Sequence, residues 1–309
     1  MNLKGIKKYK IGIIGPGRHF IRKIYPILKK NKSFKISAIL RNKKEKFKKI
    51  KNFSEKEFFK KKLDFVYIST PNEIHEKYII KSLKSDFHVI CEKPFVVKKK
   101  NLLKILKLSK EKRKLIFECF MFKYHPVFKE IKKIIDNKKL GKLKYLVSNW
   151  KYSFLDKKNN RYQKKSGNGF WYDSASYLIS FDNYFFKINK KIKIIKIRKK
   201  VSLRGAINFK SEGINRYYFW GEGQNYKNDI ELFFTEGTVY VDQFYAKKSA
   251  NKIKLKIFKN FKIYKKEYKN TNHFEKMFKD IVKNFNREDY KNLHRKNIFN
   301  QALFLSNSS

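Results

Sequence analysis

The chain has 309 residues, of which 78 are Lys or Arg and 26 are Asp or Glu, so its formal net charge is +52. Its 41% of hydrophobic and 17% of aromatic residues exclude a disordered polycation, because such chains lack the apolar side chains of a core. A length near 300 residues exceeds what one hydrophobic core usually supports, which predicts two domains.

The first part of the chain alternates strand-like and helix-like segments. Strands are predicted at 10–14, 34–40, 63–68, 87–91 and 114–119, and helices at 21–28, 74–83 and 98–110. Strands that alternate with helices in this way are typical of βαβ units. The sequence therefore predicts an α/β domain over residues 1–122, built on a doubly wound parallel sheet.

After residue 122 this alternation stops. A helix is predicted at 126–136, with further helices near 173–186 and 274–285. Between them lie mostly closely spaced strand-like segments at 144–152, 192–201, 205–210, 215–221, 229–234, 238–242 and 252–258. Closely spaced strands indicate an open, largely antiparallel sheet. Residues 123–309 are therefore predicted to form an α+β domain.

The lysines run through the whole chain, and such like-charge runs are usually solvent-exposed. Their field attracts anions whatever its origin. Cys91 and Cys119 are too few for a disulfide framework or a zinc ribbon and indicate buried thiols in a reducing compartment. No stretch approaches the roughly 18 uncharged apolar residues of a membrane span, and no signal-peptide pattern is present. We expect a soluble, cytoplasmic protein without a bound metal.

The first chemical motif is residues 12–20 (GIIGPGRHF), between a predicted strand and helix. Such a glycine turn lets backbone N–H groups approach a pyrophosphate, which predicts a dinucleotide-binding Rossmann domain. The cofactor-binding residues expected here are Gly15, Gly17, Arg18 and His19. Phe20 stands where a third glycine is usual, and its ring is expected to force helix and strand apart or to fill another gap.

The end of the second predicted strand bears on the choice of cofactor. An acidic residue there holds the ribose 2′-hydroxyl of NAD, but this chain has Arg41, followed by Lys43 and Lys44. Cations without a carboxylate suit a 2′-phosphate, so NADP is favoured over NAD. The alternative is that these are ordinary surface cations of a very basic chain.

Two segments follow the third and fourth predicted strands: residues 67–75 (YISTPNEIH) and 88–95 (HVICEKPF). With the glycine turn they resemble the signature of the Gfo/Idh/MocA family of NAD(P)-dependent oxidoreductases, which has a Rossmann turn, a Thr-Pro-x-x-x-His segment and Glu-Lys-Pro. The resemblance continues at residues 120–126 (FMFKYHP), Leu140-Gly141 and 235–242 (TEGTVYVD). It implies that residues 1–122 bind NAD(P) and that residues 123–309 serve substrate binding and oligomerisation.

The resemblance also implies roles for single residues. Thr70, Asn72, His75 and Glu92 would help to bind the cofactor. Lys93 would orient the substrate oxygen and the nicotinamide ribose, and the Lys93–Pro94 peptide is expected to be cis. The implied chemistry is hydride transfer between the nicotinamide and a secondary alcohol or ketone of a sugar or cyclitol.

The fourth motif is residues 166–177 (SGNGFWYDSASY), a glycine-containing turn before a helix. Asp173 and Tyr177 are four residues apart, which predicts one helical face. By resemblance Tyr177 is the acid/base, with a pKa lowered by Lys93, and Asp173 bonds a neighbouring hydroxyl or holds Lys93 charged. Arg161 and Tyr124 are expected at the substrate. In the simpler alternative Tyr177 packs in the core and Asp173 caps the helix.

A tyrosine at the acid/base position looks like the branch with nucleotide-hexose ketoreductases and dihydrodiol dehydrogenases, so the expected substrate is sugar-like, nucleotide-linked sugars included. A protein of the same fold that binds NADP or a sugar nucleotide without turnover stays open, because Phe20 and Asn168 depart from the family pattern. A nucleic-acid-binding protein is the other alternative, but no helix-turn-helix, zinc-finger or RNA-binding signature is present. The expected partners are the small-molecule substrate and further copies of the chain, with no specific nucleic acid and no membrane.

Overall fold

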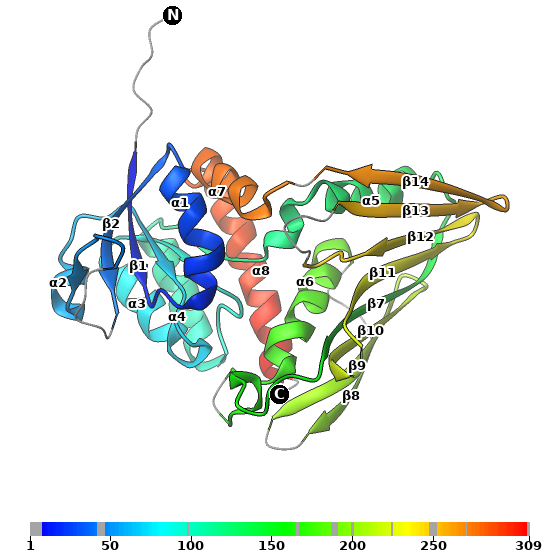
Figure 1. Ribbon diagram of the computed structural model, residues 1–309, viewed down its shortest axis with the longest axis horizontal. Coiled ribbons are helices and arrows are strands. Elements are labelled where there is room, and N and C mark those ends of the chain that lie inside the picture. Colours follow the sequence, from blue (N-terminus) through cyan, green and yellow to red (C-terminus); the bar gives the residue numbers. More distant parts are fainter. Residues whose placement is uncertain are drawn as a thin grey trace, which may run out of the picture. The chain divides into compact units, whose positions relative to one another are not determined.

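The computed structural model describes residues 8–41, 47–97, 99–164, 167–186, 191–198, 201–223, 225–246, 252–269 and 271–307. The chain divides into two compact units (Figure 1). The first comprises Met1–Cys119 and Met277–Ser306, and the second comprises Phe120–Lys276 and Asn307–Ser309. No helix in the described ranges is long and apolar enough to cross a bilayer.

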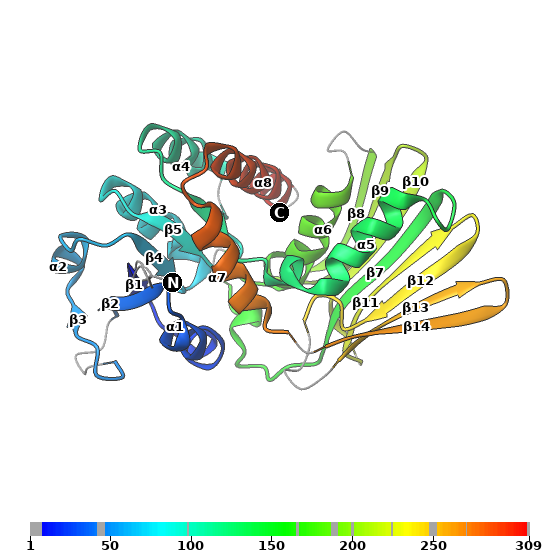
Figure 2. The same ribbon diagram turned by 90° about the horizontal axis from the view of Figure 1, so that it is seen from above.

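The first unit contains a six-stranded parallel sheet with the order β3-β2-β1-β4-β5-β6. Its strands are β1 (Tyr9–Ile14), β2 (Phe34–Leu40), β3 (Asn52–Phe53), β4 (Phe65–Ile68), β5 (His88–Cys91) and β6 (Ile116–Glu118). The helices between them are α1 (Tyr25–Lys30), α2 (Glu55–Phe59), α3 (His75–Lys84) and α4 (Lys99–Glu111). Figure 2 shows α1 on one side of the sheet and α3 and α4 on the other. The predicted doubly wound parallel sheet is confirmed.

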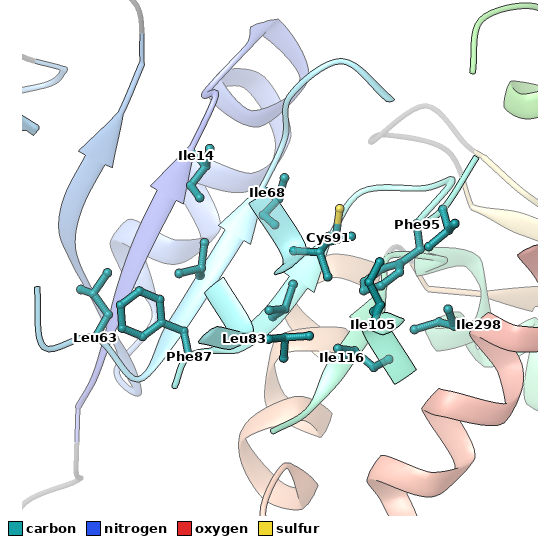
Figure 3. Packing of buried hydrophobic residues seen from close by; sticks show 14 of the residues in the cluster. Ile14, Leu63, Ile68, Leu83, Phe87, Cys91, Phe95, Ile105, Ile116 and Ile298 are labelled. Atoms are coloured by element: carbon teal, nitrogen blue, oxygen red, sulfur yellow. The ribbon is translucent and has the colours of Figure 1, made fainter. Parts of the chain in front are cut away.

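The strands of this sheet are apolar runs without alternation, as in β4, where all four residues are buried. Such runs are typical of parallel strands that are covered on both faces. Ile14, Ile68 and Cys91, near the ends of three strands, belong to one buried cluster with side chains of α3 and α4 (Figure 3). This packing fixes the carboxyl edge of the sheet, where the motifs of the first unit lie.

The end of the chain packs on the first unit. Ile298 and Ala302 of α8 (Glu288–Asn307) belong to the same buried cluster, and Figure 3 shows Ile298 pointing toward Ile105 of α4. The division therefore differs from the predicted one, which assigned all of residues 123–309 to the second domain. The boundary near 122 lies close to the observed Cys119/Phe120, but residues 277–306 return to the first unit because their apolar side chains complete its core.

The second unit contains an eight-stranded sheet with the order β14-β13-β12-β11-β7-β10-β9-β8. Its strands are β7 (Leu143–Ser153), β8 (Lys191–Arg198), β9 (Ser202–Ser211), β10 (Ile214–Gly223), β11 (Lys227–Phe234), β12 (Gly237–Asp242), β13 (Ile253–Lys259) and β14 (Lys262–Tyr268). Of the neighbouring pairs, β7 and β10 are parallel and the others antiparallel. The predicted open, largely antiparallel sheet is confirmed.

Two helices, α5 (Pro126–Asn137) and α6 (Ser176–Phe185), lie along one face of this sheet (Figure 2). A fully buried ion pair fastens α6 to β10: Asp182 Oδ1 accepts hydrogen bonds from Arg216 Nε at 2.7 Å and from the Tyr218 hydroxyl at 2.9 Å. The pair fixes how α6 rests on the sheet, and therefore where the residues at its N-terminus lie. The helix α7 (His273–Asn284) begins in the second unit and continues, from Met277, in the first.

Candidate functional site

The first unit has a cavity of about 570 Å³ at the carboxyl ends of β1, β2 and β4. It is lined by Ile14, Gly15, Pro16, Gly17, Arg18, Ile21, Arg22, Leu40, Arg41, Thr70, Pro71, Ile74 and Tyr78. Ligands of doubly wound sheets bind at this edge, beside the turn after the first strand. The structure thus brings together the predicted residues Gly15, Gly17, Arg18, Arg41 and Thr70.

The glycine turn leaves room for a ligand. Gly15 has a φ of +67°, and a Cβ there would lie 2.3 Å from Thr70 Cγ2, so only glycine fits. At Gly17 a Cβ would meet no atom closer than 4.0 Å, which marks open space above the backbone. The buried Oγ1 of Thr70 has no hydrogen-bond partner among the described residues. An open glycine backbone beside an unsatisfied hydroxyl fits the phosphates and ribose of a dinucleotide.

Phe20 fills a gap, the second of the two expected outcomes. It is fully buried, and its ring lies 5.7 Å from Tyr67 and 6.2 Å from Phe47 between centroids. The chain around it forms a π-helical turn, Phe20–Ile24, before α1. Phe20 is not among the lining residues of the cavity in the described part of the chain.

Three arginines, Arg18, Arg22 and Arg41, are among the residues that line the cavity, and no Asp or Glu of the described ranges is. The Arg41 guanidinium also lies over the Phe47 ring, 5.4 Å from its centroid. Lys43 and Lys44 lie outside the described residues. Arg22 was missed in the sequence analysis, although it stands four residues after Arg18 and therefore one helical turn away.

His75 is fully buried at the start of α3. Its Nδ1 lies 2.9 Å from the carbonyl oxygen of Pro94 and its Nε2 lies 2.9 Å from that of Thr70. Burial lowers the pKa of this imidazole, although the two carbonyl oxygens act in the opposite direction. Both ring nitrogens therefore face main-chain oxygens, and His75 joins the Thr70 loop to the Pro94 loop.

The loop after β5 carries Lys93, and the Lys93–Pro94 peptide is cis, as the resemblance implies. Two buried carboxylates hold the next residues. Glu118 Oε1 accepts a hydrogen bond from the Phe95 N–H at 2.9 Å, and Glu76 Oε1 accepts one from the Val97 N–H at 3.1 Å. Together with His75 they fix the backbone beside Lys93 before any ligand binds. Neither glutamate was singled out from the sequence.

Glu92 lies one residue before Lys93, and its carboxylate contacts two side chains of the first unit. Its Oε1 accepts a hydrogen bond from the Tyr67 hydroxyl and lies 3.3 Å from His19 Nε2. Asn72, predicted at the cofactor, is half-buried on the short 3₁₀ turn Asn72–Ile74 beside the cavity-lining Pro71. The structure thus pairs two of the predicted cofactor residues, His19 and Glu92, with each other.

In the second unit Asp173 pairs with Arg161: Arg161 Nε donates to Asp173 Oδ2 at 2.6 Å. The Arg161 guanidinium also lies over the Tyr152 ring, 4.8 Å from its centroid. Burial opposes the charge on Arg161, but the Asp173 carboxylate outweighs it and raises the pKa of Arg161. Burial and the same carboxylate raise the pKa of Tyr152. The Asp173 carboxylate is therefore held by an arginine from its own unit.

Tyr177 lies in an aromatic cluster on the helix-covered face of the sheet and is 6% exposed. Its ring centroid is 4.1 Å from that of Trp150 and 5.3 Å from that of Phe120, and its hydroxyl lies 3.8 Å from Met121 Sδ. The turn Trp171–Ala175 is π-helical and only Ser176–Phe185 is α-helical, so Asp173 lies on the π-helical turn and Tyr177 lies in the first turn of α6.

The other predicted residues of this unit lie nearby in the chain. Tyr124 is half-buried on the turn Met121–Tyr124. Asn168 donates from Nδ2 to the carbonyl oxygen of Asn160 at 2.8 Å, so it closes the loop that carries Arg161. The supporting rings of Trp150 and Tyr152 were not identified from the sequence, because aromatic residues in a strand ordinarily mark core. Among the described residues no three His, Cys, Asp or Glu side chains group as a metal site.

Known proteins resemble the chain in both units. The matching relatives include the dTDP-3,4-didehydro-2,6-dideoxy-alpha-D-glucose 3-reductases of Actinomadura kijaniata (21% identical, 60% of this chain) and Saccharopolyspora spinosa (23%, 59% of this chain). The matched segments span 57% and 56% of those two proteins, which is less than two thirds of their length. A trans-1,2-dihydrobenzene-1,2-diol dehydrogenase of Xenopus tropicalis is 20% identical over 40% of this chain and 37% of its own.

Solved structures share the fold over nearly the whole chain. A 3-ketoreductase from Actinomadura kijaniata, in complex with NADP and TDP-benzene, superposes with a TM-score of 0.88 at 17% identity and covers 97% of this chain and 96% of its own. An aldose-aldose oxidoreductase from Caulobacter crescentus, complexed with glycerol, gives 0.83 at 15% identity, with the same two coverages.

Two family models match successive parts of the chain. Residues 9–120 match the oxidoreductase family with an NAD-binding Rossmann fold, and residues 128–198 match the GFO/IDH/MocA C-terminal domain. The first match lies within the first unit except for its final residue, 120, and the second match lies within the second unit. Both models describe one family, and the first covers the glycine turn, the buried His75 and the Glu-Lys-Pro loop. The chain therefore belongs to the GFO/IDH/MocA oxidoreductases.

Proposed function

We propose that the chain is an NAD(P)-dependent oxidoreductase that interconverts a secondary alcohol and a ketone on a sugar-like substrate. The observation that carries the proposal is in the first unit. An open glycine turn follows β1 and a rigidly held Lys93 loop follows β5, so both lie at the carboxyl ends of strands of one sheet. The family match and the names of the relatives support this chemistry.

A bound nicotinamide would supply or take up the hydride. The backbones of Gly15 and Gly17, with Thr70, would hold the phosphates and ribose beside the cavity. Lys93 would donate a hydrogen bond to the reacting oxygen. Tyr177 would give that oxygen its proton during reduction and remove it during oxidation. Arg161, held by Asp173, would orient the substrate; the approach of Lys93 to Tyr177 is part of the proposal.

The finer proposal on the substrate is a nucleotide-linked keto sugar. Arg161 with the Tyr152 ring is a flat cationic group that suits a phosphate or a base, and two relatives are named as dTDP-sugar reductases. The test offers the protein a panel of keto sugars, some linked to a nucleoside diphosphate and some free. The absorbance of NADPH reports whether the cofactor is consumed. Consumption with the nucleotide-linked members supports the proposal. Cofactor fluorescence that shifts while NADPH is never consumed favours the silent binding protein instead.

The proposed cofactor is NADP, because three arginines line the cavity without a carboxylate among the described residues. Replacing Arg22 or Arg41 by glutamine is expected to weaken NADPH binding by about 10- to 100-fold, the range for losing a hydrogen bond to a charged group. NADH affinity is expected to change little, since NADH lacks the 2′-phosphate. Fluorescence titration with both nucleotides checks this. Lys30→Gln, an exposed cation at the end of α1, is the matched control; equal losses for NADPH and NADH would contradict the assignment.

We further propose that copies of the chain associate through the sheet face that α5 and α6 leave open. Tyr145 and Tyr217 are exposed there, and Asp229 and Glu231 of β11 give this face carboxylates that temper the repulsion between two basic chains. Light scattering tests this, and a mass of 37.5 kDa would overturn it.

A cytoplasmic location is also proposed, supported by the free, buried Cys91 and Cys119 and tested by cell fractionation.

A further inference from the structure

An ion pair joins two loops of the first unit that the sequence keeps far apart. His19 belongs to the glycine turn after β1, and Glu92 begins the loop that carries Lys93 after β5. The imidazole Nε2 lies 3.3 Å from Glu92 Oε1. No strand pairing joins these loops directly, because β4 lies between β1 and β5 in the sheet.

The Glu92 carboxylate is also held on its buried side. The Tyr67 hydroxyl donates to the same Glu92 oxygen, and Tyr67 itself is fully buried, with its ring 5.7 Å from Phe20 and 6.1 Å from Phe278 between centroids. Only 16% of the Glu92 side chain is exposed, whereas 50% of His19 is. A largely buried carboxylate needs partners, and here Tyr67 supplies the inner one and His19 the outer one.

We propose that His19 is a positioning residue, which through its ion pair with Glu92 ties the glycine turn to the loop that carries Lys93. The turn would hold the cofactor phosphates and Lys93 would act at the reacting oxygen, so this inference rests on the proposed function. The pair sets the spacing between those two parts of one site. His19 is the more exposed partner of the pair, whereas Glu92 is also held by Tyr67.

The charges around the pair give it a pH dependence. Burial opposes protonation of His19, but the Glu92 carboxylate raises its pKa above 6.5 against the like charges of Lys93 and Lys23. Burial acts to raise the pKa of Glu92, but its bonds to His19 and Tyr67 and the charge of Lys93 lower it. Glu92 is thus ionised throughout the neutral range. The pair is complete below pH 6.5 and is lost as the pH rises through the raised pKa of His19.

The first experiment follows the imidazole of His19 by NMR in the cofactor-free protein, with the His19→Gln variant to assign its signal. The expected pKa is above 6.5 in the natural protein and lower in Glu92→Gln, where burial acts without the carboxylate. Lys23→Gln is the matched control with the opposite sign, because it removes a like charge and should raise the pKa. If the pKa of His19 does not fall in Glu92→Gln, the proposed ion pair between His19 and Glu92 is overturned.

The second experiment measures NADPH binding by fluorescence between pH 6 and pH 9. In the natural protein the dissociation constant should rise roughly two- to five-fold as His19 loses its proton, the range for a partly exposed ion pair. His19→Gln should bind at the weaker level at every pH. Equal, parallel curves for the two proteins overturn the positioning role. If neither protein binds NADPH or NADH, the proposed function fails, and the NMR titration still decides whether the ion pair between His19 and Glu92 exists.

Discussion

The Tyr177→Phe variant is expected to lose about 10²- to 10⁴-fold in kcat for ketone reduction, the range that general acid catalysis contributes. The substitution removes only the hydroxyl. The ring keeps its contacts with Trp150 and Phe120, at 4.1 Å and 5.3 Å, so the fold and the NADPH affinity should not change. Steady-state kinetics with the best keto sugar of the panel, beside an NADPH titration, gives both quantities.

A control for this prediction is available on the same stretch of chain. Tyr172 is half-buried on the turn before α6, and Tyr172→Phe removes the same hydroxyl five residues earlier. It should retain the kcat of the natural protein. If Tyr177→Phe also retained it, Tyr177 would be a packing residue of the aromatic cluster, the simpler of the two interpretations, and another group would have to move the proton.

The Asp182→Asn variant is expected to destabilise the second unit by about 3–5 kcal/mol, because it leaves the Arg216 guanidinium buried without its countercharge. Tyr218 loses the acceptor of its hydroxyl at the same time. Urea unfolding followed by tryptophan fluorescence reports this unit alone, since Trp150, Trp171 and Trp220 all lie within Phe120–Lys276. The fluorescence midpoint should therefore fall. Circular dichroism, which follows both units, should still show the transition of the first unit at its original midpoint.

Two further variants distinguish the effect of breaking the buried ion pair from the effect of removing any carboxylate charge. Glu267→Gln removes an exposed carboxylate that pairs with Lys252 and Lys254, and it should leave the fluorescence midpoint unchanged. The double variant Asp182→Leu/Arg216→Met replaces the buried pair with apolar side chains and should recover a large part of the loss. A small effect of Asp182→Asn would show that water reaches Arg216 and that the pair does not hold α6.

The sequence predicted those parts of the fold that rest on local periodicity. β2 has the predicted bounds, 34–40, and β7, β11 and α5 agree to within two residues. The motifs located the glycine cavity and the cis Lys93–Pro94 loop, because their residues are local. The segment α2 was missed although Ser54 and Glu57 form a capping box, a signal that is legible in the sequence.

Other features could not be predicted because long-range contacts decide them. β14 is exposed at every residue except Tyr268, so it has no apolar face to mark it as a strand. The first half of α8 is polar, and its buried Lys291 and Arg295 depend on Glu288 for their charge partner. The pairing of Asp173 with Arg161, and of His19 with Glu92, joins residues whose separation carries no periodic signal.

The return of residues 277–306 to the first unit bears on how the chain folds as it is synthesised. Domains usually complete in the order in which they leave the ribosome. Here the core around Ile116 lacks Ile298 and Ala302 until the last part of the chain has emerged. The second unit is almost one continuous stretch, Phe120–Lys276, and can close before then. The cofactor-binding half, although its first strand is made first, is therefore the half that finishes last.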